Sequence, residues 1–340
     1  RRERLVCRPG HSGPSQLATP DLTPVFSGGT SLLKAHGLIQ RFSEELDFKL
    51  ILSDAFLEKS PGQKRSALSA FKNGLADAWA AAGFVITGVE AGSGNGFIQI
   101  DMDYPTILDG HDALRPHIQA EISAKPTPLA TGERPLASFV HQYRGLEPEI
   151  TAIACVDPVE TAADKLSAFC WRVLTRDRER VGDDPTIVRH LHDLAALEAT
   201  ASANAQFPAL AEETIMADSH RGGGALEGML PAQRMAALVE HLQSDTLYAD
   251  EYARFVGGMA FATEQKFPHF RKPSGRWSGF AGRYRPNRVG TGVFPCGSCG
   301  SQKMPNEIRS LHPMAAKRGR NRQPRLPDDA ILVEPGYPHN

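Results

Sequence analysis

Two carboxylates are the side chains of this sequence best placed to do chemistry. Glu45 and Asp47 lie in an apolar run that ends near Leu52, with Leu46 between them. Because side chains alternate along a β-strand, this spacing places both carboxylates on one face of the strand and Leu46 on the other. Their oxygens form a hard site that suits Mg²⁺ or Mn²⁺, and such a cation can bridge nucleotide phosphates. The pair therefore predicts a site for a divalent metal ion.

A double glycine precedes this strand and could hold the phosphates. The apolar run 24–26 is followed by Gly28 and Gly29, and an amphipathic stretch then begins with Thr30 and Ser31. Glycines have no Cβ and let the backbone pass close to a bulky anion. Thr30 and Ser31 can cap a helix whose free amides and dipole favour phosphate. The order strand, glycine turn, helix and strand thus predicts a phosphate-binding unit.

This stretch also resembles a known protein family. GGTSL (28–32) followed by RFSEELDF (41–48) is similar to the nucleotidyltransferase AbiEii/AbiGii toxin family, which belongs to the polymerase-β-like nucleotidyltransferases. The resemblance covers roughly 24–267. It implies an α/β (α+β) fold, in which a lobe with a small mixed sheet precedes a helical lobe and the nucleotide lies between them. Further segments resemble the family in the same order: LRPHIQAEIS (114–123), CVDPVETAADKLSAFCWR (155–172) and VRHLHDLAAL (188–197).

The resemblance implies roles for four more residues. Glu121 matches a third carboxylate of polymerase-β-like enzymes, which could bind the metal or accept the proton of the attacking hydroxyl. Lys165 matches a lysine that contacts nucleotide phosphates, and Arg172 lies seven residues further on the same helical face. Asp193 matches the final aspartate of a family pattern similar to RDLYDL. It could anchor Lys165 or Arg172, or hold the base or sugar of the nucleotide.

Two of these assignments, those of Glu121 and Lys165, have a structural alternative. Glu121 could be a solvated glutamate at a strand edge, and Lys165 could be an exposed helix charge paired with Asp164 or Glu160. The first metal ligand of the superfamily is usually Asp, and Glu45 is longer by one methylene. Mg²⁺ tolerates little error in its octahedral geometry, so a catalytically degenerate nucleotide-binding protein of the same fold remains an alternative.

Periodicity predicts the elements around these residues. A helix is expected over 67–82, where apolar residues recur at three- and four-residue steps and should pack on a sheet. The turn cluster 91–96 favours a hairpin. Asp101 and Asp103 alternate like the first carboxylate pair, but no glycine motif precedes them, so we interpret them as solvated. Further strands are expected at 84–89, 97–104, 117–123 and 150–156, the last at the edge of the first lobe.

Changes in composition divide the chain into four parts. Pro- and Gly-rich sequence at 126–135 is interpreted as a linker near the boundary between two lobes. After residue 268 the sequence is basic and lacks periodicity, which is typical of a disordered tail. The predicted parts are an irregular lead-in at 1–23, a nucleotidyltransferase lobe at 24–150, a helical lobe at 151–268 and the tail at 269–340.

Composition limits the classes of protein. The chain of 340 residues has 41% hydrophobic residues and a net charge of −1, which is ordinary for a globular protein. No apolar run is long enough to cross a bilayer, so no membrane partner is expected. Five cysteines at scattered positions favour a reducing compartment and a cytoplasmic location.

The resemblance also implies partners. Members of the family are toxins of bacterial toxin–antitoxin pairs, so a small DNA-binding antitoxin is expected. A tRNA 3′ end or another RNA could be the acceptor, and a small molecule such as an aminoglycoside is a further candidate. The alternative from another class is an RNA-binding protein that acts through the basic tail at 269–340.

Overall fold

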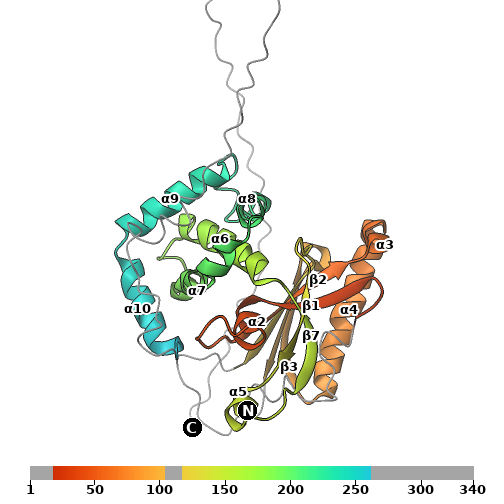
Figure 1. The fold of residues 1–340 in the computed structure, drawn as a ribbon. Helices are drawn as coiled ribbons and strands as arrows, with labels where there is room; N and C mark the ends of the chain where they lie inside the picture. The colour runs from red at the N-terminus through yellow and green to blue at the C-terminus, as the bar shows by residue number, and fades with distance from the viewer. Residues whose placement is uncertain (1–17, 104–116, 262–340) are drawn as a thin grey trace, which may run out of the picture. The chain divides into compact units, whose positions relative to one another are not determined.

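The computed structural model describes residues 18–103 and 117–261. These residues belong to one compact unit, which contains a sheet layer and a helical layer (Figure 1). The tail predicted at 269–340, and most of the lead-in predicted at 1–23, lie outside the described residues. Within the described ranges, no helix combines the length and apolar character required to span a membrane.

The sheet layer is one mixed sheet in the strand order β3-β4-β5-β2-β1-β7-β6. Strand β2 lies at its centre, where it pairs in parallel with β5 and antiparallel with β1. The strands are β1 (Leu22–Ser27), β2 (Glu45–Leu52), β3 (Val85–Gly92), β4 (Phe97–Asp103), β5 (Ile118–Ser123), β6 (Gly132–Leu136) and β7 (Ile150–Cys155). The expected mixed α/β architecture is therefore confirmed.

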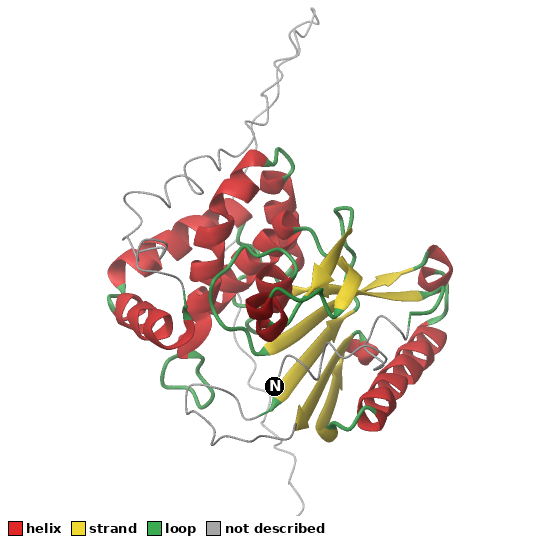
Figure 2. Ribbon diagram, turned by 60° about the horizontal axis from the view of Figure 1, so that its bottom comes forward, coloured by secondary structure: helices red, strands yellow, loops and turns green. Residues whose placement is uncertain are grey.

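The helices form two groups. Figure 2 shows the sheet between the long helix α4 and the group of helices in the second layer. That second layer has its own buried apolar cluster, to which α2 contributes Leu32 and Leu33. The helices are α2 (Gly28–Lys34), α3 (Asp54–Leu57), α4 (Pro61–Ala81), α5 (Phe139–Arg144), α6 (Pro158–Leu174), α7 (Arg189–Ala203), α8 (Phe207–Ala217), α9 (Pro231–Ser244) and α10 (Leu247–Met259), with 3₁₀ turns η2 (Ser93–Asn95) and η3 (Pro185–Val188).

Helix α4 confirms the periodicity argument for 67–82. Its N-terminus is a capping box, in which the Ser60 hydroxyl accepts from the backbone of Gln63 and the Gln63 side chain accepts from the backbone of Ser60. The buried residues of the helix lie at three- and four-residue steps and share one apolar cluster with strands of the sheet. They are Leu68, Phe71, Leu75 and Trp79.

The hairpin predicted around 91–96 is also confirmed, because β3 and β4 pair antiparallel on either side of η2. The linker predicted at 126–135 is wrong in its second half, since Gly132–Leu136 forms β6. This strand is the edge of the sheet, whereas β7, expected at the edge, lies between β1 and β6. Pro135 falls at a register shift between Arg134 and Leu136. An edge position or a bulge tolerates proline because no ladder hydrogen bond from its nitrogen is needed.

The contact between α4 and the sheet gives a stability prediction. Leu75 is fully buried, so Leu75→Ala should lower the free energy of unfolding by about 2–5 kcal/mol through lost burial and a residual cavity. Asp77→Ala is the matched control at an exposed position of the same helix and should change it by less than about 0.5 kcal/mol. Denaturant unfolding followed by circular dichroism measures both. Equal effects of the two variants would contradict the assigned packing face of α4.

Candidate active site

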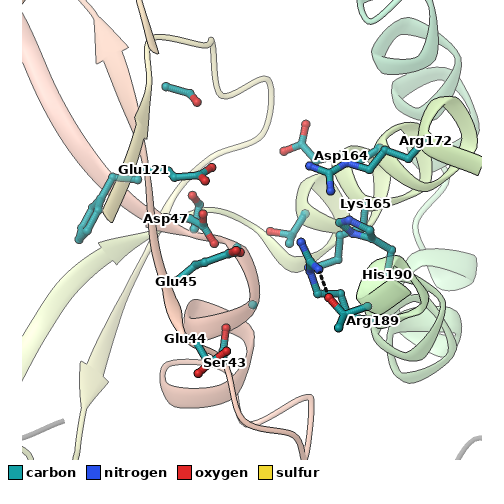
Figure 3. A pocket seen from close by; sticks show the side chains of 18 of the residues that line it. Ser43, Glu44, Glu45, Asp47, Glu121, Asp164, Lys165, Arg172, Arg189 and His190 are labelled. Atoms are coloured by element: carbon teal, nitrogen blue, oxygen red, sulfur yellow. Dashed lines mark hydrogen bonds between the residues drawn. The ribbon is translucent and has the colours of Figure 1, made fainter. Parts of the chain in front are cut away.

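A cavity of about 690 Å³ lies between the sheet and helices α6 and α7. Figure 3 shows Glu45, Asp47 and Glu121 on its sheet side, facing Lys165 and other basic side chains on its helical side. The cavity thus has an acidic wall and a basic wall. Carboxylates that can hold a divalent cation opposite cations that can neutralise phosphate oxygens form a site suited to a nucleoside triphosphate.

The acidic wall follows from the alternation of β2. Glu45 and Asp47 line the cavity, whereas Leu46 does not and packs against the apolar cluster shared with α4. Parallel pairing of β2 with β5 sets Asp47 opposite Glu121, and the Glu121 carboxylate accepts a hydrogen bond from Gln119 at 3.0 Å. The predicted common face of the two β2 carboxylates is therefore observed, and Glu121 lies beside them.

Crowding of these carboxylates changes the acidity of Asp47. Burial, followed by the negative charges of Glu45 and Glu121, raises the pKa of Asp47 from 3.8 to about 7. The positive charges of Lys165 and Arg189 oppose this increase. The Asp47 carboxylate thus lies in a negative environment that a bound cation would relieve.

The donor atoms of this wall fit a divalent metal ion in type. Three carboxylates supply the hard oxygens that Mg²⁺ and Mn²⁺ prefer, and burial together with their mutual repulsion raises the pKa of Asp47. As the side chains lie, however, no group of three or more His, Cys, Asp or Glu residues within 18–103 and 117–261 is arranged to hold a metal. The three carboxylates therefore suit a divalent metal ion by their ligand type and by their position on one wall of the cavity.

The double glycine makes room for two charged side chains, and the phosphate contact predicted for it stays a prediction. Gly28 has a φ of +69°, and a Cβ built there would lie 1.7 Å from Oδ2 of Asp47. A Cβ on Gly29 would lie 2.8 Å from Nη2 of Arg41 and 2.9 Å from Oγ of Ser43. Both glycines line the cavity, but their missing Cβ atoms make room for the Asp47 carboxylate and the Arg41 guanidinium.

The roles predicted for Thr30 and Ser31 do not agree with the structure. Helix α2 begins at Gly28 with Ser27 at its N-cap, so neither hydroxyl caps the helix. Thr30 donates its hydroxyl hydrogen to the backbone oxygen of Glu45, and Ser31 is buried. Neither residue lines the cavity, whereas Ser27, Gly28 and Gly29 do. A phosphate contact near this turn would therefore come from residues 27–29.

The basic wall is carried by helices α6 and α7. Lys165 and Arg172 both line the cavity from α6, as their seven-residue spacing predicts, and Arg189 joins them from α7. Arg172 and Arg189 share the carboxylate of Asp184 at 3.4 Å and 2.8 Å. Lys165 is not the exposed helix charge of the alternative interpretation, because it is buried and does not pair with Asp164 or Glu160.

Asp193 anchors Lys165, one of the roles predicted for it. Its carboxylate lies 2.8 Å from the Lys165 ammonium and accepts two hydrogen bonds from Arg41 at 2.6 and 2.7 Å. These positive charges and hydrogen bonds hold the pKa of Asp193 below its usual value against the effect of burial. Its ion pairs among the described residues are with Lys165 and Arg41 and not with Arg172. Asp193 is fully buried and is not among the residues that line the cavity, which favours the anchoring role over a contact with a base or sugar. It is a positioning residue.

Sequence reasoning missed several residues of the cavity. Arg41 and Arg189 lie inside the segments that carry the family resemblance. A positive charge within those segments was the feature of the sequence that could have identified them as cavity residues. His190 also lines the cavity, and its ring nitrogens are buried without a hydrogen-bond partner among the described residues. Burial and the charges of Lys165, Arg189 and Arg172 lower the pKa of His190 well below 6.5. A neutral imidazole is therefore expected at this position near pH 7.

A family model and a solved structure match this chain. The family model described as "Nucleotidyl transferase AbiEii toxin, Type IV TA system" matches residues 16–273. Among solved structures, the chain is similar to MenT4, a nucleotidyltransferase toxin from Mycobacterium tuberculosis H37Rv, with 18% identity and a TM-score of 0.39. That match covers 84% of this chain and 91% of the MenT4 chain. A search of curated proteins found no match.

The family match defines the class of protein, and the protein is a nucleotidyltransferase. Because the matched residues make up well over half of the chain, it belongs to the AbiEii family of nucleotidyltransferase toxins of type IV toxin–antitoxin systems. The resemblance noted over roughly 24–267 is thereby confirmed.

The close approach of Gly28 and Asp47 gives a prediction about activity. Gly28→Ala should displace the Asp47 carboxylate and lower nucleotidyl transfer at least about 10-fold, because a misplacement of 1 Å can cost about 100-fold. Gly37→Ala is the matched control, since Gly37 has a φ of +63° but no atom near its Cβ position. Both variants carry strain of about 1–2 kcal/mol from the positive φ. Equal activity of the two variants would show that the contact between a Cβ at position 28 and the Asp47 carboxylate does not affect catalysis, which would contradict the prediction.

The raised pKa of Asp47 predicts a pH dependence of stability. The unfolded carboxyl ionises near 3.8 and the folded one near 7, so the folded chain binds more protons between these values. This carboxyl therefore weakens the folded state progressively as the pH rises from about 4 to about 7. In chelator, Asp47→Asn should become more stable relative to the wild type across that interval. Denaturant midpoints at several pH values measure this, and a difference independent of pH would contradict it.

Proposed function

We propose that the protein transfers a nucleoside monophosphate from a nucleoside triphosphate to an acceptor hydroxyl in a reaction that requires Mg²⁺ or Mn²⁺. The observation that carries this proposal is the pair of opposed walls in one cavity, with Glu45, Asp47 and Glu121 facing Lys165 and Arg172. The acceptor oxygen forms a bond to the α-phosphorus, and the bond from that phosphorus to the leaving pyrophosphate breaks.

The basic wall binds and orients the triphosphate. The Lys165 ammonium, fixed by Asp193, donates hydrogen bonds to phosphate oxygens and neutralises charge that moves to pyrophosphate. Arg172 and Arg189 add two guanidiniums on the same side, and the turn at residues 27–29 lies at the edge of the cavity. Positioning and electrostatic stabilisation supply most of the rate in reactions of this kind.

The acidic wall would hold a divalent cation and receive the acceptor proton. Glu45, Asp47 and Glu121 are the residues that would hold a divalent cation, which when bound neutralises phosphate charge and polarises the phosphorus–oxygen bonds. Glu121 is also a candidate general base for the acceptor hydroxyl. The extra methylene of Glu45 keeps a catalytically degenerate nucleotide binder as the alternative.

The acceptor and the protein partner are further parts of the proposal. We expect an RNA hydroxyl, such as a tRNA 3′ end, as acceptor, and a cognate antitoxin as partner because the family acts in toxin–antitoxin pairs. A triphosphate substrate and RNA acceptor would place the activity in the cytoplasm. The rival RNA-binding function depends on 269–340, which lie outside the described residues.

Substitution of Asp47 tests the proposed reaction. The wild type incubated with each α-labelled triphosphate, total RNA and Mg²⁺ should label an acceptor. Asp47→Asn should lower the rate at least about 100-fold, because it removes a charged metal ligand. Gel separation and phosphorimaging of the labelled products measure the rate.

Asp103→Asn is the matched control for this experiment. Asp103 ends strand β4 and is exposed outside the cavity, so its loss should leave the transfer rate within about twofold. Unchanged labelling by Asp47→Asn would contradict the reaction. Binding of RNA that depends on 269–340 but not on Asp47, without any transfer, would favour the RNA-binding function.

A further inference from the structure

A buried ion cluster joins the strand of the acidic wall to the helix of the basic wall. The Lys49 ammonium lies 2.7 Å from Glu160 and 2.6 Å from Asp164. Lys49 is on β2, two residues after Asp47, and both acids are on α6, where Asp164 directly precedes Lys165. Strand β2 therefore carries both Asp47 and Lys49, and helix α6 carries both Lys165 and the two acids that pair with Lys49.

The geometry fixes which faces are joined. Residues 45, 47 and 49 alternate onto one face of β2, and Lys49 lines the cavity beyond Asp47. Glu160 and Asp164 are four residues apart and lie on one face of α6. The Glu160 carboxylate also accepts the backbone N–H of Leu129 at 3.2 Å, which connects the chain that follows β5 to the same cluster.

The stability of the fold alone does not explain why charged side chains join β2 to α6. Lys49 and Glu160 are buried, and burial acts against the charge of each. Apolar side chains of similar volume in place of a buried ion pair are often as stabilising or more so. Ion pairs at 2.6 and 2.7 Å, however, fix distance and direction more narrowly than an apolar contact does.

We propose that Lys49, Glu160 and Asp164 are positioning residues that hold α6 against β2, so that Lys165 faces Asp47 at the separation required for phosphoryl transfer. The inference rests on the proposed transfer reaction for its kinetic test. Lys49 acts through the two acids on α6 and contacts no reacting atom. Loss of the cluster therefore lowers the rate of the chemical step more than it lowers the affinity for the nucleotide.

A variant without charge separates positioning from folding. Lys49→Met with Glu160→Gln and Asp164→Asn removes all three charges at similar volume, so no buried charge is left unpaired. Its transfer rate at saturating triphosphate should fall about 10- to 100-fold, because misplacement by 1 Å can cost about 100-fold. The dissociation constant of the triphosphate in Mg²⁺ should change by less than about threefold.

Two further variants complete the set. Asp164→Asn alone removes the charge of the partly exposed partner and leaves Lys49 paired with Glu160, so the fold should be kept and transfer should slow about 3- to 10-fold. Lys59→Met is the matched control, because it breaks the ion pair of Lys59 with Asp21, outside the cavity in the sheet layer. Its transfer rate should stay within about twofold of the wild type.

Hydrogen exchange gives a readout that does not depend on activity. Amides of residues 159–165 in α6 should exchange faster in the triple variant than in the wild type, whereas those of α4 should not change. Wild-type transfer and wild-type exchange in a folded triple variant would overturn the positioning role. So would a loss of triphosphate affinity in proportion to the rate, since Lys49 would then be a phosphate ligand. If the wild type transfers no label, the proposed function fails. The hydrogen exchange of α6 then tests by itself whether the ion cluster positions this helix.

Discussion

The carboxylate of Asp193 is the group on which the arrangement of the cavity depends. It is fully buried and is compensated by two cations, the ammonium of Lys165 from α6 and the guanidinium of Arg41 from the segment before β2. A buried charge that lost one of these partners would be strongly destabilising. Because Arg41 in turn occupies the space left by Gly29, one ion cluster fixes the glycine turn, the chain before the acidic strand and Lys165 together.

The same physical argument explains both glycines of the motif. Asp47 lies so close to Gly28, and Arg41 so close to Gly29, that a Cβ at either position would collide with a charged side chain. The turn therefore allows an acidic group and a basic group, both of which line the cavity, to approach the backbone at adjacent residues. Their charges are complementary to a metal–triphosphate complex, in which the cation needs the acids and the phosphates need the bases.

Local features of this structure could be predicted from the sequence, whereas its long-range ion pairs could not. Alternation on β2, the helical periods of α4 and α6 and the turn between β3 and β4 depend on neighbouring residues, so pattern alone revealed them. Arg41 and Asp193 are 152 residues apart and Lys49 and Glu160 are 111 apart, and no periodicity connects such pairs. Strand β6 was missed because Gly132 and Pro135 are typical of loops, and only its position at the sheet edge permits them.

The nature of the contact between the layers bears on how the cavity responds to its substrate. The apolar residues form one cluster around the sheet and α4 and another within the helical layer. Around the cavity, the layers meet through ion pairs of Arg41, Lys49 and Lys125. Coulomb interactions extend further than apolar contacts, so under the proposed function a triphosphate and a cation between the walls would change the energy of these pairs without touching all of them. Charge placed between the two walls would therefore act on their separation and on the position of Lys165.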